Sequence, residues 1–231
     1  MFKMSFSHKP SNNAQYVTTS INKTLRWIEF LLFFVGVPLV MYVWREHVKI
    51  TLLLFMMSAA LLCVSLLLKD HTFKRFRFWN KPGFRQWIKP VSLQFLGLML
   101  FTTTVFYILR PDDIFYYPKY YFSDWLLLLV MYPLLSAIPQ EIIFRTFLFH
   151  RYKTIIPSKT LRIYVSSLCF GFAHLFYNNW VAVLLSVVAG YVFCRTYAQS
   201  RSTVLVIIEH SLWGLWMFTL GLGAYFDSAL I

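Results

Sequence analysis

Long apolar runs separated by short polar loops dominate the sequence. Each run is close to the ~20 residues that an α-helix needs to cross a bilayer, and none alternates between apolar and polar residues as a barrel strand does. Because backbone groups in lipid must be hydrogen-bonded within their own segment, the runs predict membrane-spanning helices. We expect about seven, at residues 25–44, 50–68, 91–109, 125–149, 161–177, 180–198 and 203–226.

The composition agrees with an all-α, polytopic membrane protein. Of 231 residues, 58% are hydrophobic and 13% are charged, whereas ordinary soluble domains carry about 25% charged residues. We expect one transmembrane helical domain over residues 1–231, with a polar N-terminal segment at 1–24 and the candidate chemistry concentrated in a core at 125–226. The first residues lack the order of basic, apolar and small residues that marks a cleavable signal peptide.

The basic residues indicate how the chain lies in the membrane. The net charge is +13, but Lys and Arg collect between apolar runs and do not form one stripe, which favours anionic lipid over nucleic acid as the partner. They are concentrated in the N-terminal segment and in the loops at 69–89 and 151–162, whereas the loop at 110–124 carries acidic residues. By the positive-inside rule, the N-terminus is predicted to be cytoplasmic.

Three ionisable side chains interrupt the late apolar runs at a similar depth. At ~1.5 Å per residue, Glu141, His174 and His210 each lie roughly 12–18 Å below the predicted cytoplasmic surface. Polar groups at such a depth are costly unless they face one another or water. The three residues are therefore the candidate site.

The residues around Glu141 and His210 suggest how the site is supported. Arg145 follows Glu141 by one helical turn, so its guanidinium can hold the carboxylate. Gln140 points to another side of the same helix, and Glu209, beside His210, is a local hydrogen-bond acceptor. Pro133 and Pro139 precede the pair and predict a kink or an interruption in this helix.

At these residues the sequence resembles a known family. "QEIIFR" at 140–145, "FGFAH" at 170–174 and "HSLWG" at 210–214 are similar to the EExxxR, FxxxH and HxxxN motifs of the CPBP family, which comprises CAAX proteases and bacteriocin-processing (Abi) intramembrane proteases. Their order, their spacing and their placement on late helices agree with that family. The resemblance covers about residues 125–226.

The resemblance implies a glutamate-type intramembrane endopeptidase that cleaves a membrane-embedded or lipidated peptide. It implies that a first-motif glutamate and His174 activate a water, that His210 donates to the oxyanion, and that Arg145 orients the acidic motif. Prenylated CAAX peptides, leader peptides and sorting signals all fit this class of substrate. The family relationship also implies an integral, multi-pass protein of the bacterial inner (cytoplasmic) membrane.

Two positions depart from the family motifs. The first glutamate is replaced by Gln140, whose amide cannot act as a base, and the final asparagine is replaced by Gly214, which removes a side-chain donor. In one interpretation Glu141 is the base, and His210 forms the oxyanion site together with a backbone group or the Asn178 or Asn179 amide. In the other, the chain is a catalytically inactive member that acts as a binding, scaffold or bacteriocin self-immunity protein.

The same three ionisable residues could serve other chemistries. Glu141, His174 and His210 could form a zinc set of two histidines and one glutamate, but Arg145 beside Glu141 would oppose a divalent cation. We therefore expect no cofactor and no metal. A transporter with Glu141 as coupling carboxylate is disfavoured, because no paired discontinuous helices or inverted halves are visible.

Overall fold

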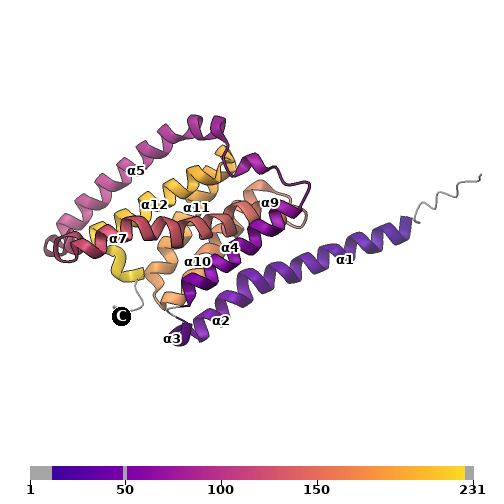
Figure 1. Cartoon of the computed structure of the whole chain (residues 1–231), viewed down its shortest axis with the longest axis horizontal. Coiled ribbons are helices and arrows are strands. Elements are labelled where there is room, and N and C mark those ends of the chain that lie inside the picture. The colour runs from indigo at the N-terminus through magenta and orange to yellow at the C-terminus, as the bar shows by residue number, and fades with distance from the viewer. Residues whose placement is uncertain (1–11, 49–50, 227–231) are drawn as a thin grey trace, which may run out of the picture.

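The computed structural model describes residues 12–48 and 51–226, and over these residues the chain is helical and has no strand. In this described part of the chain, six helical stretches are long and apolar enough to cross a membrane, which confirms the all-α polytopic class (Figure 1). They are Asn22–Val43, Leu52–Lys69, Arg75–Leu109, Phe122–Arg151, Trp180–Ser200 and Thr203–Leu220.

The segment predicted as a further span at 161–177 is helical, but it is not one of these candidate spans and its helix changes type near its end. Its α-helix, α10, covers Lys159–Ala173, and a 3-10 turn, η6, continues it over His174–Tyr177. The turn ends at Asn178, which has the left-handed backbone conformation (φ 51°) and stops the helix. Within the described residues the structure thus has six candidate spans and, at the place of the remaining expected span, this helix of mixed type. α10 packs along α11 (Trp180–Ser200), so it is part of the core.

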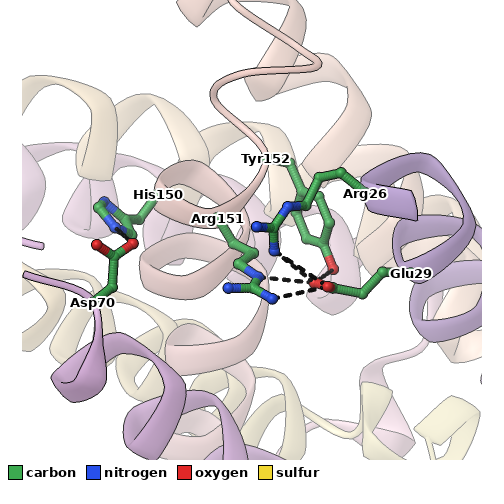
Figure 2. Close-up of polar contacts among 6 residues, drawn as sticks. All are labelled: Arg26, Glu29, Asp70, His150, Arg151 and Tyr152. Carbon is green, nitrogen blue, oxygen red and sulfur yellow. Dashed lines mark hydrogen bonds and ion pairs between the residues drawn. The ribbon is translucent and has the colours of Figure 1, made fainter. Parts of the chain in front are cut away.

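The first span is held to the rest of the bundle by a polar cluster. α1 (Asn12–Leu31) begins inside the segment predicted to be polar, while residues 1–11 lie outside the described part of the chain. The Arg151 guanidinium donates to both carboxylate oxygens of Glu29 at 2.9 Å, and the Tyr152 hydroxyl donates to Oε1 at 3.1 Å (Figure 2). Arg26 also contacts Glu29, at 3.2 Å. These contacts join α1 to α9 (Leu148–Arg151) and the residue that follows it.

The segments predicted to be cytoplasmic meet at one end of the bundle. His150 Nε2 lies 2.8 Å from Asp70 Oδ2 (Figure 2), and Asn80 Nδ2 donates to the Ser200 carbonyl at 2.7 Å. The loop after α4 (Leu52–Lys69), the start of α5 (Lys81–Leu109) and the turn before α12 (Thr203–Leu220) therefore share this end. The positive-inside prediction requires these loops to lie at the same end of the bundle, as they do. That this end faces the cytoplasm is a prediction.

Asp70 gives this end of the bundle a testable pH dependence. Its hydrogen bond with His150, followed by those with Thr72, holds the pKa of the Asp70 carboxyl well below its usual range. A depressed carboxyl pKa contributes stability that is present above the unfolded value of ~3.9 and is lost as the pH falls through the folded value. We expect Asp70→Asn to lower the melting temperature by a few degrees at pH 7, and the difference from wild type to shrink below about pH 4. The exposed Asp112→Asn is the control, and a difference that stays constant with pH would contradict the assignment.

The span that carries Glu141 is interrupted by two π-helical turns. α7 (Phe122–Tyr132) leads into η4 (Pro133–Ala137), and the single turn α8 (Ile138–Glu141) leads into η5 (Ile142–Phe147). Proline has no backbone N–H, so Pro133 and Pro139 each remove a helical hydrogen bond, and π-turns of this kind are frequent at functional sites. The predicted interruption is confirmed.

The remaining elements are short helices and helical turns, some of which form part of the spans. They are η1 (Leu32–Gly36), α2 (Val37–Val43), α3 (Arg45–Val48), η2 (Arg75–Arg77), η3 (Pro111–Asp113), α6 (Tyr116–Tyr120) and η7 (Leu222–Phe226). η1 and α2 extend the first span, and α2 packs against η6. The first span therefore reaches the turn that carries His174.

Candidate active site

Glu141 and Arg145 form a fully buried ion pair. Arg145 Nη1 lies 3.1 Å from Glu141 Oε1, and neither side chain has any exposed surface. The contact follows from their spacing of one helical turn, as the sequence predicts. A buried charge needs a partner of this kind, because leaving it unpaired in a low-dielectric interior is very costly.

Two aromatic rings complete the surroundings of Arg145. The guanidinium carbon lies 4.3 Å from the centroid of the Phe170 ring and 5.3 Å from that of Phe193. The negative faces of such rings attract a cation, and more strongly where water is excluded. Phe170 comes from α10 and Phe193 from α11, so two neighbouring helices contribute contacts to the guanidinium.

Glu141 also contacts His210, and this contact fixes the tautomer of the imidazole. His210 Nδ1 lies 2.7 Å from Glu141 Oε1, the same oxygen that contacts Arg145. A carboxylate beside a guanidinium is acceptor-only, so the hydrogen must be on Nδ1. In a neutral imidazole the other nitrogen, Nε2, then carries a lone pair. The arrangement is a carboxylate–histidine dyad.

His174 has its tautomer fixed in the same way by the backbone. Its Nδ1 lies 2.7 Å from the Phe170 carbonyl oxygen, which can only accept a hydrogen bond. His174 starts the 3-10 turn at the end of α10, and the change of helix type leaves the carbonyl one turn back within reach. In the neutral ring, Nε2 is again the acceptor.

The two histidines line one cavity of about 250 Å³. Its wall also contains Tyr132, Gln140 and Gly214, together with apolar side chains of α7, α11 and α12. Glu141 and Arg145 do not line it, so the ion pair acts on the cavity through His210. A group in the cavity meets two imidazoles and a largely apolar wall.

A second cavity of about 140 Å³ adjoins the first. It is lined mainly by apolar side chains of η1, α2 and α4, together with residues of the interrupted span and of η6. Both cavities share Ser136, Gln140, His174 and Tyr177 as lining residues. These shared residues separate a histidine-lined space from an apolar one that faces the first two spans.

The other predicted residues take different places. Gln140 lines both cavities, and its amide donates to Ser136 Oγ at 2.8 Å. Glu209 is fully buried and lines neither cavity, and Asn178 is exposed and accepts from the Tyr42 hydroxyl at 3.2 Å. The structure therefore brings together Glu141, Arg145, Gln140, His174 and His210, and leaves Asn178 at the turn.

Sequence reasoning missed Tyr132 and Phe193. Both line the first cavity, and Tyr132 stands directly before the first π-helical turn. Phe, Trp and Tyr make up 20% of the chain, so one aromatic residue in a span carries no distinctive signal. Only the three-dimensional packing selects these two.

The candidate site does not have the ligand set of a metal site. Within residues 12–48 and 51–226, no group of three or more His, Cys, Asp and Glu side chains converges as a set that could hold a metal ion. Glu141 meets only one of the two cavity histidines, and its contact oxygen also faces Arg145.

Part of the chain is similar to a known protein family. A family model described as Type II CAAX prenyl endopeptidase Rce1-like matches residues 122–216. This segment contains the candidate site, and the match confirms the resemblance that the three motifs predict. No curated protein and no solved structure gives a significant match.

Proposed function

We propose that this integral membrane protein hydrolyses a peptide bond within the bilayer. The match of residues 122–216 to the family model of type II CAAX prenyl endopeptidases, Rce1-like, supports this proposal. The observation that carries the proposal is the 2.7 Å contact of Glu141 with His210, because His210 also lines the cavity. The carboxylate lies 3.1 Å from Arg145 and 2.7 Å from His210, so it can stabilise an imidazolium at His210. His210 Nε2 is therefore suited to take a proton from water.

The reaction needs no further group for its proton transfers. The water oxygen attacks the peptide carbonyl carbon while its proton moves to His210 Nε2, and the resulting imidazolium is stabilised by Glu141. The carbon–nitrogen bond then breaks, and the same proton passes to the leaving amine. His174 Nε2, an acceptor on the same cavity wall, holds the water in position. Glu141 and His174 thus act together on one water, Glu141 through His210.

The walls of the two cavities indicate the class of substrate. The histidine-lined cavity joins an apolar space formed by the first two spans, and both are set among membrane-spanning helices. A peptide that is lipidated or embedded in the membrane can present its cleavage site to the histidines and its apolar part to the second cavity.

We further propose that the protein lies in a bacterial inner membrane, with anionic lipids bound at the basic loops.

Cleavage by purified protein tests the proposal. The protein in detergent or in liposomes is incubated with farnesylated and unmodified versions of a set of peptides, and the products are identified by mass spectrometry. We expect cleavage that His210→Ala abolishes and that favours the lipidated peptides. Equal retention of activity in His210→Ala would contradict the dyad.

One observation favours a second candidate function, a membrane protein that binds a peptide without cutting it. Gln140 places an amide on the cavity wall where the family motif has a carboxylate, and Ser136 fixes that amide at 2.8 Å. An amide offers hydrogen bonds but accepts no proton. Such a site would retain a lipidated peptide as a scaffold or immunity protein does.

The variant Gln140→Glu separates the two functions. If the Glu141–His210 dyad is the base, wild type already cleaves, and an added carboxylate at 140 changes the rate by less than tenfold. If the protein only binds, wild type shows no product although it retains the peptide, and Gln140→Glu creates or strongly raises cleavage. Gln140→Ala is the matched control for loss of the amide.

Metal removal gives a further prediction. Because the dyad and His174 can activate water by proton transfer alone, cleavage should persist at the wild-type rate after prolonged treatment with a strong chelator and subsequent dialysis. Metal analysis of the same sample accompanies the assay. Loss of activity that stoichiometric zinc restores would overturn this prediction.

A further inference from the structure

Tyr132 occupies the space beside Gly214. A Cβ atom added to Gly214 would lie 2.0 Å from the Tyr132 hydroxyl oxygen and 2.2 Å from Cζ. Both residues line the first cavity, together with His210. The phenol of Tyr132 therefore lies where a side chain at 214 would otherwise project, and any larger residue at 214 requires Tyr132 to move.

The ring of Tyr132 is held on two sides. It makes an edge contact with the His210 ring at 5.9 Å between centroids, and another with Phe218 at 5.7 Å. Tyr132 is the last residue of α7, and the π-helical turn η4 begins with the next residue, so its backbone position is set by the interrupted span. Contacts of this kind fix the orientation of an aromatic ring.

We propose that the Tyr132 hydroxyl donates a hydrogen bond to the oxyanion formed when water attacks the substrate carbonyl. The inference rests on the proposed hydrolysis, and adds to it the donor that the sequence lacks at position 214. A phenol is a neutral O–H donor, and its position beside the base histidine is where the negative oxygen develops. The phenolic proton stays on Tyr132, and no bond of its side chain is made or broken.

Gly214 and Tyr132 then form a matched pair. A small residue at 214 admits the phenol, and the phenol supplies the donor. This explains how the cavity can lack a polar side chain at 214 and still stabilise negative charge next to His210.

Tyr132→Phe is the first test, with peptide cleavage followed at varied substrate concentration. Loss of one oxyanion donor is expected to lower kcat by ~10²–10³ while KM stays within a few-fold of wild type. Tyr164→Phe, which removes a hydroxyl from an exposed ring of α10, is the control and should leave both constants unchanged. A Tyr132→Phe enzyme with wild-type kcat, or with a changed KM alone, would overturn the proposal.

Moving the donor is the second test. Gly214→Asn alone should impair the enzyme, because the new side chain meets the phenol. Tyr132→Ala removes the obstacle and the donor, and the double variant Tyr132→Ala with Gly214→Asn should recover at least tenfold in kcat over Tyr132→Ala. A double variant that melts like wild type and recovers nothing counts against the donor role. Absence of cleavage by wild type would instead reject the proposed function, so the two failures are distinguishable.

Discussion

Glu141→Gln is expected to lower the rate of peptide cleavage by about 10²–10⁴, the usual contribution of a general base. The amide no longer stabilises an imidazolium at His210 and can leave the ring in the wrong tautomer, so both the basicity and the orientation of Nε2 are lost. The dyad acts as one unit, and such groups are strongly non-additive. Glu141→Gln combined with His210→Ala should therefore be no slower than the slower single variant.

The matched control is Glu46→Gln, the same change at an exposed carboxylate that contacts Arg45 at 3.4 Å. Rates are compared per folded molecule, with folding judged by melting temperature and by monodisperse elution. If the effects of Glu141→Gln and His210→Ala multiply in the double variant, the two residues act independently and the dyad is wrong.

The positions of most helices follow from the sequence alone. A chain in lipid must satisfy its backbone hydrogen bonds locally, so an apolar run of sufficient length is a helix. The rarity of ionisable residues in such runs also selects Glu141, His174 and His210, and the one-turn spacing predicts the Glu141–Arg145 pair that is present at 3.1 Å. These inferences use only local spacing and the cost of burying charge.

The contacts between residues far apart in the sequence could not be predicted, because they depend on how the helices are rotated against one another. The contact of Glu141 with His210 is set by the packing of α12 against the interrupted span, and no local pattern encodes it. The same holds for Tyr132 against Gly214 and for the cluster of Glu29 with Arg151. The change from α-helix to 3-10 turn at His174 was also not predicted, because the apolar run continues past Ala173 without a local signal.

Arg145→Met is expected to have the second large effect, first on folding. The change leaves the Glu141 carboxylate buried without its cationic partner, and breaking a buried pair from one side costs about 3–5 kcal/mol. Expression and melting temperature should both fall markedly. Arg145→Lys keeps the charge but loses the planar group that lies over Phe170 at 4.3 Å, so it should fall between Arg145→Met and wild type.

The double variant Arg145→Met with Glu141→Gln distinguishes the effect of the ion pair on stability from its effect on the cleavage rate. It replaces both charges with neutral groups of similar size, and such replacements of buried pairs are often neutral or stabilising. The melting temperature should return toward the wild-type value. Cleavage should not return, because the carboxylate that supports His210 is gone, and the rate should stay about 10²–10⁴ below wild type. If this double variant is folded and cleaves at the wild-type rate, the ion pair only joins helices and the base lies elsewhere in the cavity. If it is folded and inactive, the charges of the pair are dispensable for stability, while the Glu141 carboxylate is needed by His210 for catalysis.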